Sequence, residues 1–540
     1  LERMVHVHRE EWLDLLGQLF VVGFNGKTVT DEVKTLIHDY RIGNFILFGR
    51  NIGSGEEVLA LTSSLQEEAR KAGHQYPLLI CTDQENGVVQ RLKPPAVTFP
   101  GAMAIGAADD SELAFQIGKA TGLELKEVGI NWNLAPVADV NNNPDNPVIN
   151  VRSFGESPEK VATLMLAWMK GCQEAGVATT LKHFPGHGDT HTDSHLDLPV
   201  IHHSLERLSK VELVPFMEGI KNGADTIMSA HIYFSALVER PDWPATLSRN
   251  VLTGLLRNRL GFKGVITTDC LEMNAIAKTV GVAKGAVYAI QAGADVAMVS
   301  HTYHHQIEAI KALLDAAQSG KIPLDQLEHS RDRIYHLKEK YAQVPDQKVS
   351  EESFTYFGCV EHQELAEKAY RESVCVIGKP KTLPITGDAK VLAVYPGKKT
   401  HLQVEERIYE TKIGAALSSY PLSMDQDCID DSKVDIEEKI QMLKGKSQNY
   451  DYVLLFTLSN KKDKYNQMVK ALRALENTYL ISLRGPFSLL PVGGSIDALC
   501  VFDDSATAIH AALDALFGKS KITGKMPVTF SPGGERRYRS

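Results

Sequence analysis

The sequence predicts an α/β protein in which a (β/α)8 TIM-type barrel is followed by an α/β sandwich domain. Two observations support this prediction. Eight short, apolar and mostly β-branched runs alternate with longer helical patterns over roughly the first 300 residues, which favours parallel strands joined by helices. Polar and charged residues follow most of these runs, as expected where the carboxyl ends of barrel strands meet on one rim. An open, doubly wound sheet is the alternative.

The barrel is expected to occupy residues 1–340. Its predicted strands are residues 19–24, 44–48, 78–81, 130–136, 177–181, 225–228, 264–267 and 295–299. Helical patterns lie between them, among them residues 111–128, 158–175 and 205–222. The polar clusters at the strand ends are Gly49-Arg50, residues 82–87, Asp139 with an Asn-rich loop, Lys182-His183, residues 229–231 and Thr268-Asp269. In a barrel these clusters converge on one pocket.

Residues 341–360 predict a linker, because the periodic pattern lapses there into charged and polar residues. Residues 361–540 predict a second α/β domain. We expect helices at 362–373, 465–476 and 506–517, and strands at 374–377, 391–395, 452–457, 479–483 and 498–502. Residues 425–445 are rich in charge and predict a solvated helix or loop. This domain lacks a dense ionisable cluster, so we expect it to act as a scaffold or to line the pocket.

Composition excludes several classes of protein. The 540 residues are 43% hydrophobic, which is ample for large cores, and the net charge of −9 is mild, so neither a nucleic acid nor an anionic membrane is an expected partner. No apolar run approaches the roughly 20 residues that span a bilayer. The chain has seven cysteines without metal-ligand spacing, and Cys81, Cys375 and Cys500 fall in apolar runs. With no visible signal peptide, this favours reduced thiols in the cytoplasm, or secretion of a processed precursor.

The stretch from Lys182 to His195 holds the densest group of ionisable residues. Histidines recur at every fourth position, 183, 187, 191 and 195, a spacing that on a helix face would suit zinc. Pro185 and the glycines around it argue against that helix. Acid/base catalysis is the other candidate, because Asp189 can accept from one nitrogen of His191 and fix the tautomer of the other. A merely polar loop is the remaining alternative.

Asp269 follows a predicted buried strand, so packed backbone would hold its carboxylate at the pocket. Such a carboxylate is ionised at neutral pH and can act as a nucleophile. Together with an acid/base group on another loop it would equip a retaining glycosidase. The alternative is a carboxylate that caps the next helix.

Asp83, Arg152, Lys182 and His183 can be read as a clamp for a polyol, because a carboxylate accepts from neighbouring hydroxyls while the cations donate. For Arg152 and Lys182 a structural ion pair in the barrel mouth is equally open. Trp132 and Trp243 can stack on a sugar ring or belong to the core.

At these residues the chain resembles the β-N-acetylglucosaminidases of glycoside hydrolase family 3. The resemblance is strong over about residues 10–340 and weak beyond, where residues 524–530 (GKMPVTF) look like the closing motif of two-domain members. The matching motifs are KHFPGHGDTHTDSH at 182–195, DQENG at 83–87, RSFG at 152–155, MSAH at 228–231, PATLS at 244–248 and GFKGVITTD at 261–269.

The resemblance implies a barrel followed by an α/β sandwich, and a covalent glycosyl-enzyme on Asp269. It also implies that His191 is the acid/base, oriented by Asp189. The residues it implies for holding a terminal N-acetylglucosamine are Asp83, Arg152, Lys182, His183 and His231. No metal and no organic cofactor are implied. Asn86 departs from the glycine of many members, and some members carry further domains, including acetyltransferase-like ones, so a longer native chain is open.

The predicted function is an exo-acting, retaining β-N-acetylglucosaminidase that removes terminal N-acetylglucosamine from chitin oligosaccharides or peptidoglycan fragments. A phosphorylase that forms N-acetylglucosamine 1-phosphate is the first alternative, because a neutral histidine acid/base would not repel phosphate as a carboxylate would. A non-catalytic sugar-binding protein and a metal-dependent hydrolase are the others.

Overall fold

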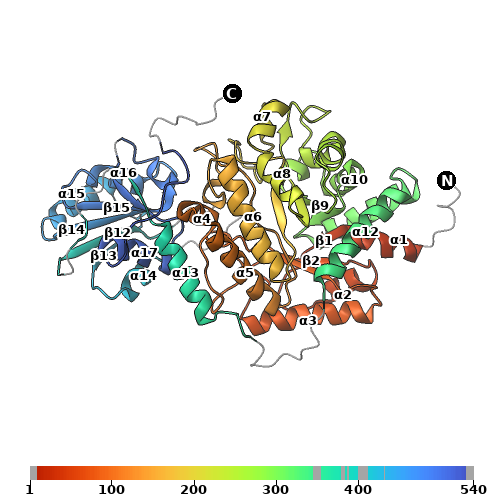
Figure 1. Ribbon diagram of the computed structural model, residues 1–540, viewed down its shortest axis with the longest axis horizontal. Helices are drawn as coiled ribbons and strands as arrows, with labels where there is room; N and C mark the ends of the chain where they lie inside the picture. The colour runs from red at the N-terminus through yellow and green to blue at the C-terminus, as the bar shows by residue number, and fades with distance from the viewer. Residues whose placement is uncertain are drawn as a thin grey trace.

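The computed structural model describes residues 9–343, 354–378, 383–385, 388–398, 411–430, 432–433, 435–494 and 496–530. The chain forms two units, a larger barrel and a smaller sheet domain, which lie side by side (Figure 1). Residues 344–353 of the predicted linker lie outside the described residues.

Eight parallel strands form the barrel, which confirms the predicted fold class. In sheet order they are β4 (Trp132–Asn133), β3 (Leu79–Thr82), β2 (Asn44–Leu47), β1 (Phe20–Val22), β10 (Val296–Val299), β9 (Val265–Cys270), β7 (Thr226–Ser229) and β5 (Thr180–Phe184). Parallel bridges from Trp132 to Ala178 and from Val137 to Lys182 join the two ends of this sheet. Each strand coincides with one of the eight predicted runs.

Two strands extend further than the sequence predicted. β5 reaches Phe184 and β9 reaches Cys270, so Lys182, His183 and Asp269 lie within strands and not after them. Polar side chains are tolerated there because alternate residues of a barrel strand point inward, and near the rim inward means toward the pocket.

Several barrel helices begin with residues that favour a helix start. Ser54 forms a capping box with Glu57, and Pro158 occupies the first turn of α6. The predicted helix 205–222 is divided in two, because Pro215 in its interior favours a new start. The helices are α1 (Arg9–Leu16), α2 (Asp31–His38), α3 (Gly55–Lys71), α4 (Ala102–Ala108), α5 (Ser111–Glu127), α6 (Pro158–Glu174), α7 (Leu205–Lys210), α8 (Val214–Lys221), η4 (Asn250–Arg259), α9 (Asn274–Ala277), α10 (Val282–Ala292), α11 (Tyr303–Gln318) and α12 (Leu324–Tyr341).

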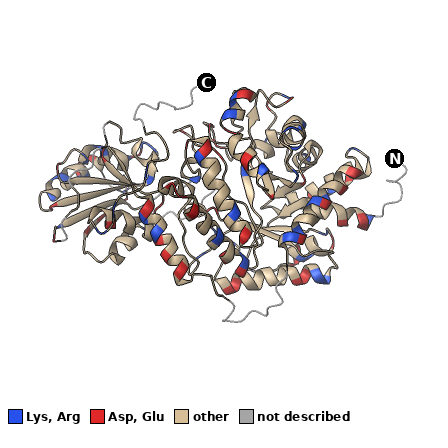
Figure 2. Ribbon diagram, viewed as in Figure 1, with Lys and Arg blue, Asp and Glu red and all other residues tan. Residues whose placement is uncertain are grey.

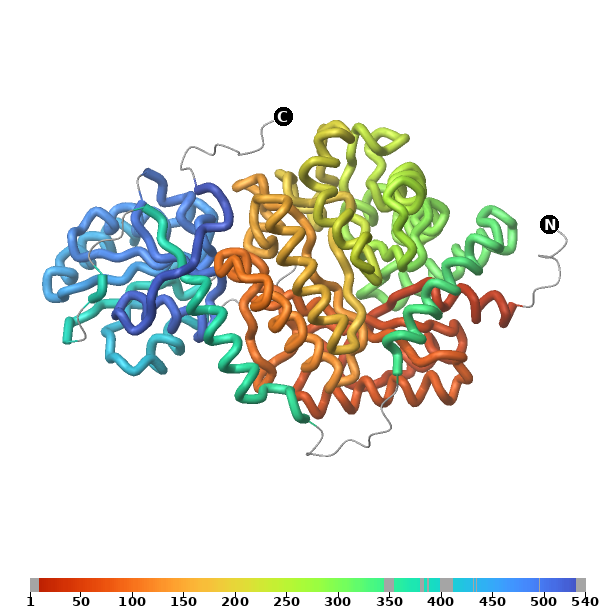
Figure 3. Tube along the Cα trace, viewed as in Figure 1, coloured from red at the N-terminus to blue at the C-terminus, as the bar shows by residue number. Residues whose placement is uncertain are grey.

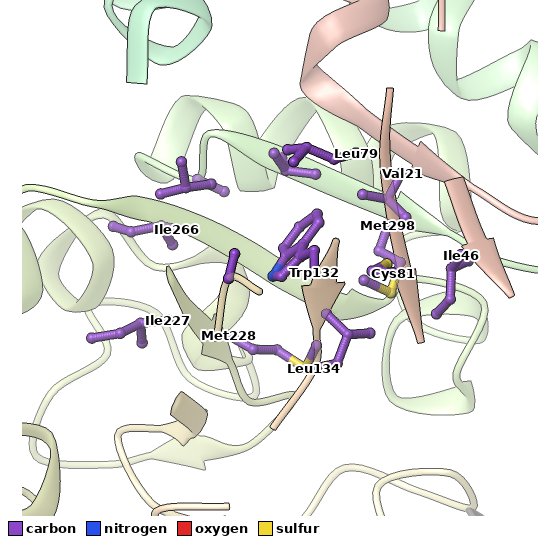
Figure 4. Close-up of a cluster of buried hydrophobic side chains, with 14 of the residues drawn as sticks. Val21, Ile46, Leu79, Cys81, Trp132, Leu134, Ile227, Met228, Ile266 and Met298 are labelled. Carbon is purple, nitrogen blue, oxygen red and sulfur yellow. The ribbon is translucent and has the colours of Figure 1, made fainter. Parts of the chain in front are cut away.

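Side chains from strands around the ring fill the barrel interior (Figure 4). Trp132 is fully buried, and its indole N–H donates to Thr180 Oγ1 at 2.8 Å, across the seam between β4 and β5. The tryptophan is therefore a core residue and not a platform for a sugar ring. Ile46, Leu134, Met228 and Met298 of this cluster also line the cavity described below.

The second domain is a six-stranded sheet between helices. Its strand order is β11 (Cys375–Ile377), β16 (Ala498–Cys500), β15 (Thr478–Pro486), β14 (Tyr452–Thr457), β12 (Val391–Pro396) and β13 (Asp425–Ile429), with only β11 antiparallel to its neighbour among the described strands. Core residues of α13 (Val360–Ser373), α14 (Ile413–Ser419) and α17 (Ala506–Leu516) cover one face. Core residues of α15 (Ile436–Ser447) and α16 (Lys464–Leu472) cover the other.

The strand β13 was missed, because the sequence predicted a solvated helix or loop for residues 425–445. β13 lies at the sheet edge and exposes much of its polar face, so it lacks the apolar run that marks a buried strand. The helical part of that prediction corresponds to α15.

Barrel residues complete the core of the second domain. Met103, Ala104 and Ala107 of α4 and the adjacent Val151 are buried in one cluster with residues of the six-stranded sheet. The helix α13 runs between α4 and the sheet domain, as the tube in Figure 3 shows. The two units therefore share apolar packing close to the loop that carries Arg152.

Basic and acidic residues are interspersed along the helices of both units (Figure 2). Within the described part of the chain, no helix has the length and apolar character needed to cross a membrane. All seven cysteines are free thiols, and Cys81, Cys375 and Cys500 are buried as predicted.

Candidate active site

A cavity of about 620 Å³ lies at the carboxyl ends of the barrel strands. Its wall contains residues from seven of the eight strands or from the loops that follow them, whereas the sequence predicted polar clusters at the ends of six. The polar residues of its lining are Arg50, Asp83, Arg91, Arg152, Lys182, His183, His187, Ser194, His195, Asp269, Ser300 and His301. Four predicted residues are therefore brought together with Asp269: Asp83, Arg152, Lys182 and His183.

Two carboxylates, the buried Glu85 and the partly buried Asp83, hold the cations of the predicted clamp. Lys182 Nζ lies 2.9 Å from Asp83 Oδ1 and 2.7 Å from Glu85 Oε1. Arg152 grips Glu85 with two parallel bonds, Nε to Oε2 at 2.9 Å and Nη2 to Oε1 at 2.7 Å. Arg152 and Lys182 thus each form structural ion pairs with carboxylates, the alternative that the sequence left open, and both also line the cavity.

Glu85 is the residue of this cluster that sequence reasoning missed. Burial would raise the pKa of its carboxyl, but the charges of Arg152 and Lys182 outweigh burial and hold that pKa well below the ordinary range. The sequence did contain one indication of its role, because Glu85 lies two residues after Asp83 in the same strand-end cluster. Asn86 stands where many members of the family carry glycine, and its φ is 73°. Asparagine tolerates this left-handed conformation, so the backbone can accept it here.

Asp139 fixes the orientation of His183. Its Oδ2 accepts from His183 Nδ1 at 2.8 Å, and its Oδ1 accepts the backbone N–H groups of His183 and His187. The Nε2 atom of His183 is left as the polar atom for the cavity. Burial lowers the pKa of His187 to about 4, so this ring is neutral and bridges the Thr190 and Ser194 hydroxyls.

Asp269 lies near the end of β9 and is partly exposed to the cavity. Its Oδ1 accepts the N–H of Cys270 at 2.7 Å, which fixes the carboxylate relative to the strand. Burial acts to raise the pKa of Asp269, but the charges of His231, His183 and His195 dominate and lower it. The group is therefore an anion over the neutral pH range, as a nucleophile requires.

His231 lies behind Asp269 and does not line the cavity. It is buried, its Nε2 donates to the carbonyl of Cys270 at 2.9 Å, and its Nδ1 lies 2.8 Å from Thr246 Oγ1. Burial lowers the pKa of His231, although Asp269 opposes this effect. The ring therefore supports the end of β9 and is not placed to contact a sugar directly.

The structure brings Asp193 and His195 to the cavity, and not the predicted pair. His195 Nδ1 lies 2.7 Å from Asp193 Oδ1, and His195 lines the cavity. Burial would raise the pKa of Asp193, but the hydrogen bond from His195 outweighs it and lowers that pKa. By contrast, His191 is exposed and Asp189 lies 2.7 Å from His203 Nε2; neither residue lines the cavity.

Spacing could not separate these two pairs. The loop contains two Asp-X-His triplets, at 189–191 and 193–195, and both offer the same local geometry. The chain turns back after Thr190, so the second triplet faces the pocket. That turn depends on long-range bonds such as those from Asn146 Nδ2 to the carbonyls of His187 and Gly188, both at 2.8 Å.

The four histidines of the loop do not share one centre. Asp139 lies beside His183, two hydroxyls lie beside His187, the Asn143 amide lies beside His191, and Asp193 lies beside His195. Across the described residues, no group of three or more His, Cys, Asp or Glu side chains is arranged to hold a metal ion. Trp243 also lies away from the cavity lining, with the Arg240 guanidinium 4.4 Å over its ring.

A barrel that collects carboxylates, imidazoles and cations in one rim cavity defines an enzyme acting on a small polar substrate. The family model described as the glycosyl hydrolase family 3 N terminal domain matches residues 13–337. The chain belongs to this family and is a glycoside hydrolase, which confirms the predicted resemblance.

Several relatives match the chain beyond the barrel. A solved glycoside hydrolase family 3 β-N-acetylglucosaminidase from Paenibacillus sp. str. FPU-7 is 36% identical with a TM-score of 0.89, covering 96% of this chain and 98% of that one. Beta-hexosaminidase A of Pseudoalteromonas piscicida is 36% identical over 402 residues, 71% of this chain and 67% of the relative.

A fungal multi-domain β-N-acetylglucosaminidase with an acetyltransferase region matches 98% of this chain with a TM-score of 0.88, but this match spans only 62% of the fungal chain. A β-glucoside phosphorylase at 23% identity and a TM-score of 0.82 shares the fold.

Proposed function

We propose that this hydrolase removes N-acetylglucosamine from non-reducing ends of β-linked oligosaccharides, with retention of configuration. The observation that carries the proposal is one cavity lined by Asp269, by His195 with its partner Asp193, and by the Asp83, Arg152, Lys182 and His183 clamp. The names of the relatives, β-N-acetylglucosaminidase and β-hexosaminidase, agree with this substrate class.

The size of the cavity supports attack on chain ends. Its volume of about 620 Å³ lies within the range of pockets for small ligands, roughly 300–1,000 Å³, and far below that of a groove for a polymer. The clamp closes one side of the pocket with buried charges, so a terminal sugar is expected to enter with its hydroxyls facing Asp83, Arg152 and Lys182.

The proposed mechanism uses two groups of the cavity, the Asp269 carboxylate and the His195 imidazole. The Asp269 carboxylate attacks the anomeric carbon while His195 gives a proton to the leaving oxygen, and a covalent glycosyl-enzyme forms. In the second half, His195 takes a proton from water, which attacks the anomeric carbon and releases Asp269. Asp193 holds His195 Nδ1, so Nε2 is the nitrogen that exchanges the proton.

The acid/base role is assigned to His195 in place of the predicted His191. We expect His195→Ala to slow hydrolysis of chitobiose by about 10²- to 10⁴-fold, with a much smaller loss on 4-nitrophenyl N-acetyl-β-glucosaminide, whose leaving group needs no proton. Asp269→Asn should lose about 10³-fold or more on both substrates.

His191→Ala is the matched control, because it removes the same side chain from the same loop. It should keep most of the rate on chitobiose. If His191→Ala showed the larger and leaving-group-dependent loss, the original assignment to Asp189 and His191 would be restored. Free N-acetylglucosamine as the product, with and without phosphate, distinguishes the hydrolase from the phosphorylase.

A further inference from the structure

His195 lies on a stretch of chain without regular secondary structure. Residues 185–199, between β5 and β6 (Val200–Ile201), form neither helix nor strand, so a ladder of backbone bonds does not fix the position of the proposed acid. Contacts with other parts of the chain must therefore hold this stretch in place. Asn146, in the Asn-rich loop after β4, supplies several of these contacts.

The side chain of Asn146 is 1% exposed, and its amide bonds in two directions. Its Nδ2 donates to the carbonyls of His187 and Gly188, both at 2.8 Å. Its Oδ1 accepts the backbone N–H groups of Val148 at 2.9 Å and of Ile149 at 2.8 Å. Because carbonyls only accept and backbone N–H groups only donate, the amide can take just one orientation here.

A series of buried side chains connects Asn146 to the acid. Thr190 Oγ1 lies 3.3 Å from Asn146 Nδ2 and 2.8 Å from His187 Nδ1. On the other side of the same ring, His187 Nε2 lies 3.1 Å from the hydroxyl of Ser194. Ser194 directly precedes His195 in the chain. A displacement of the backbone that Asn146 holds would therefore also displace His195.

The acceptor oxygen of Asn146 contacts the loop of the proposed sugar clamp. The carbonyl of Val148 accepts from Arg152 Nη1 at 3.3 Å, and Val148 also lines the cavity. One buried amide therefore joins the loop of the acid to the loop of the clamp. Substitution can separate the two connections, because aspartate keeps an acceptor oxygen for Val148 and loses the amide donors.

We propose that Asn146 is a positioning residue that holds His195 at the leaving oxygen through its two amide N–H groups. Asn146 is not part of the cavity lining, so it acts through the loop and not on the substrate. The inference rests on the proposed function, in which His195 gives the proton. It names a residue outside the cavity on which that proton transfer depends.

The test is Asn146→Asp, which keeps the shape of the side chain. A carboxylate has no N–H for the two carbonyls, and even a protonated aspartate offers only one donor. We expect kcat/KM for chitobiose to fall about 10- to 100-fold, because a displacement of about 1 Å takes the acid away from the leaving oxygen. On 4-nitrophenyl N-acetyl-β-glucosaminide, whose leaving group needs no proton, the fall should stay below about threefold. An equal loss on both substrates, or no loss on chitobiose, overturns the proposal.

Asn131→Asp is the matched control. Asn131 makes the same kinds of bond at the amino end of β4, with Nδ2 donating to the carbonyl of Leu78 at 3.0 Å and Oδ1 accepting the N–H of Ile80 at 2.8 Å. This substitution should lower the unfolding midpoint and leave the ratio of the two kcat/KM values unchanged. Lost stability alone is thereby separated from a displaced acid.

A double variant shows whether Asn146 acts through His195. In the background of His195→Ala, Asn146→Asp should slow chitobiose hydrolysis by less than about twofold more, because the acid that it positions is already absent. A further loss as large as that of the single variant would show that Asn146 supports another step, which contradicts the proposal.

Thr190 provides the test if Asn146→Asp does not fold. Thr190→Val removes the hydroxyl between Asn146 and His187, and it should slow chitobiose hydrolysis more than hydrolysis of the 4-nitrophenyl substrate. Thr190→Ser keeps the hydroxyl and should retain most of the rate on chitobiose. Identical rates for the two Thr190 variants would count against the connection.

Failure of the proposed function has a different signature. In that case the wild type would release no N-acetylglucosamine from either substrate. The contacts of Asn146 are then tested without turnover, by hydrogen exchange of the backbone N–H groups of residues 186–196 measured by mass spectrometry. Faster exchange there in Asn146→Asp than in the wild type and Asn131→Asp would support the positioning role, and equal exchange in all three would refute it.

Discussion

Glu85 balances the positive charges of the proposed sugar clamp. It contacts both Lys182 and Arg152, and all three side chains are almost completely buried. Two cations removed from water need this carboxylate, because an unpaired buried charge costs several kcal/mol. The clamp can therefore present fixed donors to a substrate only while Glu85 is ionised.

We expect Glu85→Gln to lower the free energy of unfolding by about 3–5 kcal/mol at pH 7, because it leaves the cations unbalanced while keeping the shape of the side chain. The pKa of Glu85 is lowered in the folded state, so its contribution is complete above the unfolded value near 4.3 and is lost as the pH falls further. Denaturant unfolding at pH 7 and below 4 measures this.

The control for Glu85→Gln is Glu206→Gln, which removes an exposed partner of Lys210 on α7. It should change stability by less than about 0.5 kcal/mol. A difference between wild type and Glu85→Gln that stays constant below pH 4 would show that the carboxylate is not held ionised by its neighbours.

Single residues were predictable where a strand end fixed their direction. Asp83, Lys182, His183 and Asp269 were identified because each lies near the carboxyl end of a barrel strand, and parallel strands share one rim. Glu85 and the Asp193–His195 pair were not, because their positions follow from a turn and from contacts with residues distant in sequence. Local spacing holds no information on such contacts.

Helix α12 closes the barrel with a buried cation of its own. Lys338 is 1% exposed, and its Nζ donates to Gln18 Oε1 and to the carbonyl of Gly43, both at 2.9 Å. None of the described carboxylates lies within ion-pair distance of it. Burial therefore lowers the pKa of Lys338 to about 7.

This shift predicts a stability that rises with pH. Between pH 7 and about 10.4 the unfolded chain keeps the proton that the folded chain has lost, so raising the pH favours the folded state. Relative to Lys338→Met, the wild type should gain up to about 1.4 kcal/mol per pH unit. Thermal and denaturant unfolding from pH 7 to 10 measure this gain.

Lys311→Met is the control for Lys338→Met, because Lys311 is an exposed lysine of the neighbouring α11. Its stability curve should run parallel to that of the wild type. Parallel curves for Lys338→Met as well would mean that Lys338 keeps its proton in the folded state.

Whole elements were predicted more completely than their ends. The eight barrel strands stood out because each is an apolar run buried on both faces, which requires no knowledge of the partner strand. β13 was missed because an edge strand needs little apolar character. The last residues of β5 and β9 were missed because inward polar side chains at a rim resemble a loop in sequence.

The two units are joined beside the proposed sugar clamp. The backbone N–H of Glu156 donates to the carbonyl of Pro527 at 3.1 Å, and the Glu156 carboxylate accepts from the backbone N–H and hydroxyl of Thr529 at 2.8 and 2.6 Å. Val151, next to Arg152, packs in the core of the second domain. The loop that carries Arg152 therefore contacts both the barrel and the second domain. The sequence pattern of either unit alone does not predict this contact.

We expect Thr529→Val, which removes the hydroxyl donor to Glu156, to raise KM for chitobiose about two- to fivefold with a smaller change in kcat. A bond to a charged group is worth about 1.5–3 kcal/mol, and part of that loss should appear as a looser clamp, at about fivefold per kcal/mol. Thr163→Val is the control, because its hydroxyl bonds only within α6. Steady-state kinetics beside thermal unfolding separate the two effects: a lower unfolding midpoint with unchanged KM would show that the second domain stabilises the barrel without positioning Arg152.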